Sequence, residues 1–219
     1  MYMRSLFVGL ALAIAPVAAT ASTVSIKFLD AADTELLMVT DGGVGDIAAE
    51  AGVVGFAGAV GGMSFTMVSA TQFLAPPTDQ LQTVFSVTNT SQTANTLKLL
   101  STAHFSNSGS GNWLGTFTAT ANDATGDIFS VMQYIGGSAF DTSTAPVLSA
   151  TGAVFSASAM ALFDPTNYWI TQSFDITLAA GSSASASADF VGVIPVPAAG
   201  LLLIGGLGGL ALIRRRKTA

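Results

Sequence analysis

Hydrophobic and polar residues alternate through much of the middle of the chain. In the first such segment, Val24, Ile26 and Phe28 are separated from one another by single polar residues. Alternation with a period of two places the two sets of side chains on opposite faces of a β-strand, whereas a helix shows a period of about 3.6. This pattern therefore predicts strands with one buried face.

The same alternation recurs in later segments. The side chains predicted to share a buried strand face are Met63, Phe65 and Met67, then Leu97, Leu99, Ala103 and Phe105, then Trp113, Phe117 and Ala119, and finally Tyr168, Ile170, Phe174, Ile176 and Leu178. Further strand-like runs cover residues 81–88, 128–135 and 184–191, and turn-forming clusters occupy 89–95, 106–112, 122–127 and 164–167.

Strands at this spacing predict an all-β domain, an antiparallel β-sandwich or jelly roll. Two segments lack the strand pattern, residues 31–39 and 46–51, and each is expected to form a helical turn or two.

The N-terminal end has a different composition. Arg4 precedes an apolar run over residues 6–15, and Ala19 and Ala21 follow in an Ala-Thr-Ala sequence. A basic start, a short apolar run and small residues at this spacing are typical of a secretory signal peptide. We therefore expect cleavage after Ala21 and export of the chain.

The C-terminal end has the pattern of a membrane anchor. Residues 198–213 are apolar throughout, and at about 1.5 Å per residue they would rise about 24 Å. The preceding uncharged residues can supply the rest of a hydrocarbon core of about 30 Å. A basic cluster follows at once, formed by Arg214, Arg215, Arg216 and Lys217. The positive-inside rule predicts that this cluster lies in the cytoplasm and the domain on the other side.

A proline motif precedes the apolar segment. Its residues are Val193, Pro195, Val196, Pro197, Ala198, Ala199 and Gly200, with Ile194 inserted before the first proline. Together with the apolar segment and the basic cluster, this motif resembles the VPLPA-type variant of the PEP-CTERM sorting signal of Gram-negative bacteria, although valine replaces the usual leucine. The resemblance implies that the chain is a substrate of an exosortase, a membrane-embedded protease that would cut near the prolines and pass the protein to the cell surface or the extracellular polysaccharide matrix.

These features divide the chain into three parts. Residues 1–21 are the expected signal peptide, 22–192 the β-sandwich domain, and 193–219 the sorting signal, with its transmembrane helix at about 198–213 and its basic tail at 214–217. Before processing, the protein would be held in the inner membrane with its domain in the periplasm.

Charge and composition exclude several functions. Between Ser22 and Val193 the chain has two basic residues, Lys27 and Lys98, and 13 acidic ones, so the charge is 2 − 13 = −11. Such a domain cannot present a basic surface to nucleic acid. The chain has no cysteine, which excludes disulfides, thiolate metal sites and a cysteine nucleophile.

Catalytic residues are not expected either. His104 is the only histidine, and the alternation predicts that it points to solvent rather than into a cleft. No Gly-x-Ser-x-Gly sequence occurs, and most aspartates lie in turns, where they commonly accept hydrogen bonds from nearby backbone. We therefore expect a non-enzymatic protein with no cofactor.

A structural calcium ion is an alternative use of the acidic residues, because calcium binds six to eight oxygens. The two clusters to consider are Asn122, Asp123, Gly126 and Asp127, and Asp30, Asp33 and Glu35. Neither has the spacing of an EF-hand loop.

Taken together, the sequence predicts an exported cell-surface or matrix protein, delivered by an exosortase and linked to exopolysaccharide or biofilm. Trp113 and Trp169 are the candidate side chains for stacking on a sugar. Two alternatives stay open, a secreted hydrolase and a carbohydrate-binding module with a plain membrane anchor.

Overall fold

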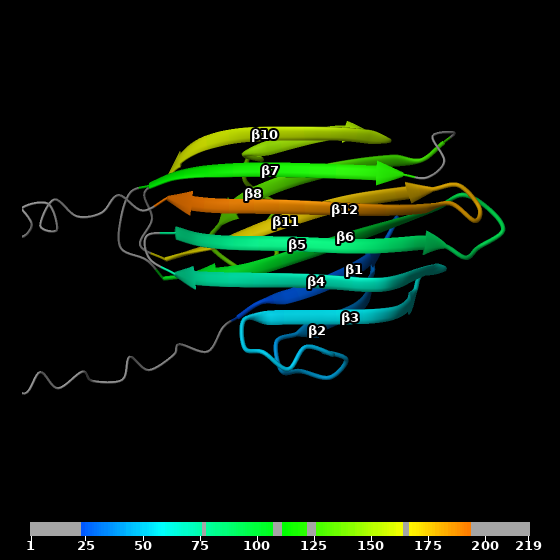
Figure 1. Cartoon of the computed structure of the whole chain (residues 1–219), viewed down its shortest axis with the longest axis horizontal. Helices are drawn as coiled ribbons and strands as arrows, with labels where there is room; N and C mark the ends of the chain where they lie inside the picture. The colour runs from blue at the N-terminus through cyan, green and yellow to red at the C-terminus, as the bar shows by residue number, and fades with distance from the viewer. Residues whose placement is uncertain (1–22, 76–77, 107–110, 122–125, 164–166, 194–219) are drawn as a thin grey trace, which may run out of the picture.

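The computed structural model describes residues 23–75, 78–106, 111–121, 126–163 and 167–193, and within them it contains strands and no helix (Figure 1). The twelve strands are β1 (Ser25–Asp30), β2 (Glu35–Thr40), β3 (Val53–Val60), β4 (Met63–Ala75), β5 (Thr78–Asn89), β6 (Asn95–Phe105), β7 (Gly111–Ala121), β8 (Ile128–Gly136), β9 (Leu148–Gly152), β10 (Val154–Phe163), β11 (Tyr168–Leu178) and β12 (Ser183–Val193). The predicted all-β fold is thus confirmed.

The strands form two antiparallel six-stranded sheets packed face to face. Sheet 1 has the order β2-β1-β6-β11-β8-β9, and sheet 2 has the order β10-β7-β12-β5-β4-β3. The pairing is nested, since β5 pairs with β12, β6 with β11, β7 with β10 and β8 with β9. This is the topology of a jelly roll, to which β1–β4 add two strands at one edge of each sheet.

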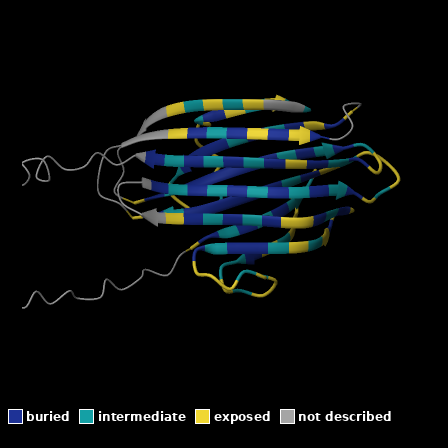
Figure 2. Cartoon of the chain, viewed as in Figure 1, coloured by how far each residue is buried: buried dark blue, intermediate teal, exposed yellow. Residues whose placement is uncertain are grey.

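The core lies between the sheets and is rich in phenylalanine (Figure 2). Phe85 of sheet 2 and Phe174 of sheet 1 meet edge to face, with ring centroids 5.1 Å apart. This geometry suits the charge distribution of aromatic rings. Most predicted core side chains are buried here, among them Ile26, Phe28, Met63, Phe65, Leu97, Leu99, Ala103, Phe105, Phe117, Ala119, Tyr168, Ile170, Phe174, Ile176 and Leu178.

Met67 is a correction to the predicted core. The ladder between β4 and β5 shifts register between Phe65 and Met67, because a β-bulge at this point adds one residue to β4 and turns the following side chains over. Met67 is consequently 49% exposed, and Val68 is fully buried in its place.

The prediction of helical turns at 31–39 and 46–51 is also wrong. The first segment contains β2, which pairs with β1 and thereby satisfies its backbone hydrogen bonds in a ladder. The second is an irregular loop held by Asp46, whose carboxylate accepts hydrogen bonds from the backbone N–H groups of Gly42, Ala48 and Gly55. Backbone N–H groups that would bond to carbonyls in a helix donate to this side chain instead.

The predicted ends of the chain lie mostly outside the described residues. Val193 is described, as the last residue of β12, whereas Ala19, Ala21, the rest of the proline motif and the basic cluster are not. Among the residues that are described, no helix is long and apolar enough to cross a membrane.

Candidate functional site

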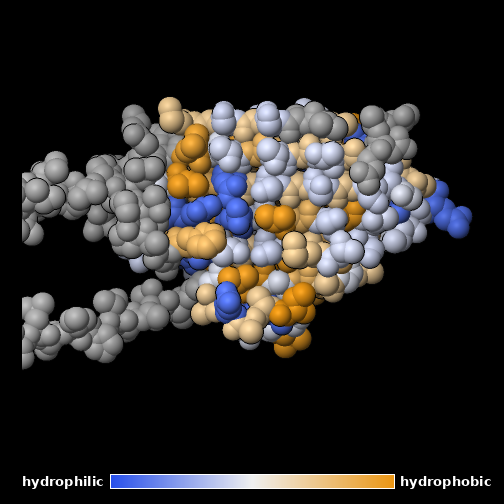
Figure 3. Space-filling model, in the orientation of Figure 1, coloured by the Kyte–Doolittle hydropathy of each residue, from blue (hydrophilic) through white to orange (hydrophobic). Residues whose placement is uncertain are grey.

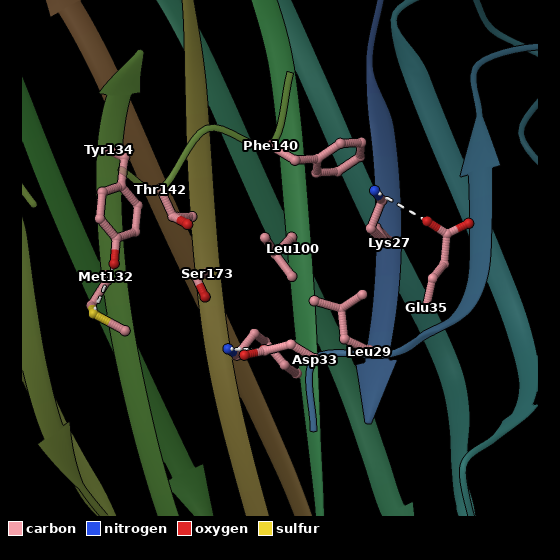
Figure 4. Close-up of a pocket in the computed structure, with 11 residues that line it drawn as sticks. Lys27, Leu29, Asp33, Glu35, Leu100, Met132, Tyr134, Phe140, Thr142 and Ser173 are labelled. Carbon is pink, nitrogen blue, oxygen red and sulfur yellow. Dashed lines mark hydrogen bonds and ion pairs between the residues drawn. The ribbon is translucent and has the colours of Figure 1, made fainter. Parts of the chain in front are cut away.

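A groove of about 360 Å³ opens on the outer face of sheet 1 (Figure 4). Its floor follows the register of four adjacent strands, on which Lys27, Leu100, Ser173 and Met132 are successive cross-strand neighbours. The segment that joins β8 to β9 forms one wall of the groove and contributes Phe140 and Thr142.

Two cation–carboxylate pairs lie in the groove. The Lys27 ammonium is 3.1 Å from Glu35. The Lys98 ammonium hydrogen-bonds to Asp33 and lies 3.8 Å from Asp175. Lys27 and Lys98 are the two basic residues of the part of the chain that the structure describes, so the groove concentrates all of that region's cationic side chains.

Asp175 lies beside the groove as the cross-strand neighbour of Lys98. Its side chain is 34% exposed, and its Oδ1 atom accepts no hydrogen bond within the described residues. Burial raises the pKa of this carboxyl, Lys98 partly opposes the effect, and the negative charge of Asp33 adds to it. Burial alone would lower the pKa of Lys98, but Asp33 and Asp175 outweigh it and the pKa is raised. Lys98 therefore stays charged, while Asp175 holds its proton to a higher pH than an ordinary aspartate.

Aromatic and apolar side chains complete the groove. The ring of Phe140 lies over the Lys27 ammonium, 4.5 Å from nitrogen to ring centroid, which is within the range of a cation–π interaction. On the opposite side Tyr134 donates a hydrogen bond from its hydroxyl to the Met132 sulfur at 3.0 Å. The groove thus presents an aromatic wall, a thioether and paired polar groups to the same space (Figure 4).

The wall formed by residues 137–147 is fixed to the sheet. Phe140 donates a backbone hydrogen bond to the Thr102 hydroxyl at 3.4 Å, and the Thr144 hydroxyl donates to the Ile135 carbonyl at 3.1 Å. Thr102, which this segment contacts, is fully buried although it lies on the outer face of β6. Phe140 itself has φ = 58°, a left-handed conformation that is uncommon for a bulky side chain.

A second aromatic cluster lies on the same face, beyond this wall. Trp169 and His104 are cross-strand neighbours on β11 and β6, and their ring centroids are 5.0 Å apart. The Nε2 atom of His104 hydrogen-bonds to the Asn167 side chain. His104 is therefore placed on the outer face, as predicted, with an amide and an indole as neighbours. The side chain of Trp113, the other candidate for sugar stacking, lies outside what the structure describes.

The acidic clusters considered for calcium have other partners where they are described. The Asp30 carboxylate accepts hydrogen bonds from the backbone N–H groups of Ala32 and Thr34, while Asp33 and Glu35 pair with the two lysines. Asp127 accepts one from the Ala179 N–H group at 2.8 Å. Across the described ranges, no group of three or more histidine, cysteine, aspartate or glutamate side chains is arranged to hold a metal ion.

The outer face of sheet 2 has a different chemistry (Figure 3). Serine and threonine side chains follow one another across its strands, as in the row Ser156, Thr118 and Ser187 on β10, β7 and β12. The carboxylate of Asp189 on this face accepts hydrogen bonds from Gln80 and Gln82, each at 2.9 Å. The groove of sheet 1 instead combines aromatic side chains with lysine–carboxylate pairs.

Sequence reasoning did not identify the groove. In the sequence, Lys27 and Lys98 stand out only as rare basic residues. Asp33 and Glu35 stand out only as part of a candidate calcium cluster, in a segment expected to be helical. The available signal was the scarcity of lysine, since each lysine alternates with buried residues and so had to lie on an outer face. The wall residue Phe140 had no such signal, because the loop that carries it has no periodicity.

Comparisons with known proteins give distant structural similarity. No family model matches the chain, and no curated protein matches it. The K3 adhesin domain of the lysine-specific gingipain of Porphyromonas gingivalis is 13% identical, with a TM-score of 0.30 over 50% of this chain and 72% of that one. A family 35 carbohydrate-binding module from Clostridium thermocellum is 11% identical, with a TM-score of 0.29 over 64% and 98%. Similarity at this level supports no conclusion about ligand or activity.

Proposed function

We propose that the domain binds a neutral glycan in the groove of sheet 1, and that it is the exported part of a cell-surface or matrix protein. The observation that carries this proposal is the groove itself, in which Phe140 and Tyr134 face hydrogen-bonding side chains across an open space of about 360 Å³. That volume is within the range of small-molecule sites, which combine apolar walls with a few convergent polar groups.

The polar groups suit sugar hydroxyls, which both donate and accept hydrogen bonds. Glu35 can accept from a hydroxyl and Lys27 can donate to one. The Lys27–Glu35 pair is partly exposed, and such pairs contribute only about 0–1 kcal/mol. Exchanging part of that pairing for bonds to a ligand therefore costs little, while the apolar face of a sugar ring packs against Phe140.

The charge of the domain favours a neutral ligand over a polyanion. The groove pairs Asp33 and Glu35 with two lysines, so its own charges balance, while the surrounding domain is strongly acidic. A polyanionic chain would meet long-range repulsion.

Export and sorting are the second half of the proposal. The signal peptide with its expected cleavage after Ala21, and the proline motif, apolar segment and basic cluster of residues 193–219, support delivery through the inner membrane by an exosortase. Surface or matrix localisation would bring the groove to extracellular polysaccharide.

Binding is tested with the purified full-length chain on a neutral-glycan array and, for each hit, by titration. The variants Phe140→Ala and Glu35→Gln should weaken binding at least tenfold, because truncating a residue that anchors a ligand commonly costs about 2 kcal/mol or more. Thr118→Ala, on the outer face of sheet 2, is the matched control and should bind normally. Absence of binding, or equal binding by all variants, would reject the groove as the site.

A glycoside hydrolase is a second candidate, and one observation favours it. Retaining and inverting glycosidases use a carboxylic acid of raised pKa beside a second carboxylate. Asp175, whose carboxyl has a raised pKa, is the cross-strand neighbour of Lys98, beside the groove that contains Asp33 and Glu35. Incubation of each bound glycan with the chain separates the two functions. Product that appears with the parent chain and not with Asp175→Asn would assign a hydrolase.

A further inference from the structure

The Trp169 cluster and the groove are aligned along the same two strands. Trp169 and Ser173 are four residues apart on β11, and His104 and Leu100 are four residues apart on β6, all on the outer face of sheet 1. At about 3.4 Å per residue the two places are about 14 Å apart. The segment 137–147 lies between them.

The cluster has the groups that a sugar site needs. One flank of Trp169 is covered by His104, and its cross-strand neighbour on the other flank is Gly136, which has no side chain. The Asp141 side chain occupies the space over Gly136, where a Cβ atom would lie 2.6 Å from its Oδ2 atom. An indole face, a carboxylate and the Asn167 amide therefore gather at one end of the sheet.

The Asp141 carboxylate is held in place and remains charged. Its Oδ1 atom accepts hydrogen bonds from the Ser143 hydroxyl and backbone N–H group, at 2.6 and 3.0 Å. These bonds, with a further one from the Gly137 N–H group, lower the pKa of Asp141. A fixed carboxylate beside an aromatic ring can accept from two neighbouring hydroxyls of a sugar that stacks on the ring.

We propose that Trp169, with Asp141 and Asn167, forms a second subsite for a neutral glycan, and that one polysaccharide chain occupies it and the groove together. This inference rests on the proposed function of the groove. The single segment 137–147 supplies Phe140 to the groove and Asp141 to the second subsite, so it sets the spacing between them. Ligands long enough to reach both subsites gain affinity from the second contact without any change at the first.

The test uses the full-length chain carrying Trp113→Phe, in which Trp169 is the one remaining tryptophan. The probe is the neutral extracellular polysaccharide of the host cell, used whole and as fragments graded upward from the disaccharide. Long fragments should shift the fluorescence of Trp169, and Trp169→Ala, measured by calorimetry, should weaken their binding about a hundredfold. Binding of the disaccharide should change little, and Trp169→Phe, which keeps an aromatic face, should restore much of the affinity.

The outcomes separate this proposal from the proposed function. Loss of long-fragment binding in Trp169→Ala, with disaccharide binding kept and with normal binding by Thr118→Ala, supports two linked subsites. Unchanged binding of long fragments by Trp169→Ala overturns the second subsite and leaves the groove. Binding that depends on Trp169 but is indifferent to Phe140→Ala and Glu35→Gln overturns the groove, and with it the linkage.

Discussion

The pKa of the Asp175 carboxyl is changed by the surroundings that the fold gives it. Asp175 lies on the outer face of β11, yet its burial there disfavours its charge, and Lys98 at 3.8 Å compensates only in part. A carboxylate in this position costs folding free energy that its protonated form does not. Charged Asp175 therefore lowers the free energy of unfolding, as residues at binding sites often do.

Replacing Asp175 by Asn should make stability less dependent on pH. Because the pKa of Asp175 is raised in the folded state, the folded chain binds this proton more tightly than the unfolded chain, whose pKa is about 3.9. The free energy of unfolding of the parent chain should therefore fall as pH rises from about 4 through the folded pKa, relative to Asp175→Asn. Urea unfolding over a series of pH values measures this difference.

Asp141→Asn is the control with the opposite sign. Its pKa is lowered in the folded state, so it contributes stability above the unfolded pKa and loses that contribution as pH falls. If the difference in free energy of unfolding between the parent chain and Asp175→Asn were the same at every pH, the conclusion that burial raises the pKa of Asp175 would be wrong.

At position 140 we expect a glycine variant to be more stable than an alanine variant, the reverse of the usual order. The φ of 58° at Phe140 lies in the left-handed region, where a side chain costs about 1–2 kcal/mol and glycine does not. Phe140→Gly should therefore unfold at a higher urea concentration than Phe140→Ala, although both should lose binding in the groove. A more stable alanine variant would show that the segment relaxes to another backbone conformation.

At the scale of elements, the strand pattern predicted the sandwich because most strands have one face in the core and one outside. The prediction failed where a neighbour changed the environment of a strand. A β-bulge places Met67 on the surface. Residues Glu35–Thr40 form a strand because they pair with β1. The segment 137–147 covers the Thr102 hydroxyl on the outer face of sheet 1. These are tertiary contacts, which have no periodic signal in the local sequence.

A buried polar side chain, Gln133, lies between the two sheets, and the local sequence pattern does not predict it. Gln133 is fully buried, and its side-chain amide donates to the Asp189 carbonyl across the sandwich at 3.2 Å. The space for it comes from Gly115 on β7, where an added Cβ would lie 2.1 Å from the Gln133 Oε1 atom. Glycine at position 115 therefore leaves the room that the Gln133 side chain needs.

Gly115→Ala should destabilise the domain by about 1–3 kcal/mol, the usual cost of overpacking a core. Adding Gln133→Ala to Gly115→Ala should cost less than Gln133→Ala costs in the parent chain, because it removes the clash. Thermal unfolding of the four chains measures the coupling. Gly137→Ala, where nothing lies within 4 Å of the added atom, should be nearly neutral, and additive effects would contradict the proposed contact.

For the whole molecule, the sequence carries predictions about export and sorting but none about the position of the groove. The residues on which the export and sorting predictions rest are contiguous in the chain, so those predictions can be made without the fold. The groove combines side chains from β1, β2, β6, β8, β11 and two loops, and such a site becomes visible only when the sheet brings them together.

Processing of the C-terminal segment is a prediction at this scale. In cells that have an exosortase, the mature protein should end near Pro195 or Pro197, and replacing both prolines by Ala should leave a membrane-held, unprocessed chain. Removing residues 214–217 should instead let the chain escape uncut or stall, because each such charge costs roughly 2.5–3.5 kcal/mol at mid-bilayer. Mass spectrometry of the surface fraction measures the terminus, and an intact Ala219 there would leave a plain membrane anchor.

The position of the two lysines has a consequence for proteases. Trypsin cuts after lysine or arginine in a segment that can enter its cleft, and in the described part of the chain those residues are Lys27 and Lys98 alone. Both are inside strands β1 and β6, which lie next to each other within sheet 1 and have neighbours on both sides. A cut at either residue requires that the sheet open. When trypsin is in sufficient excess that cleavage is faster than reclosing, the rate of cutting at these two lysines would therefore measure the rate at which the sheet opens.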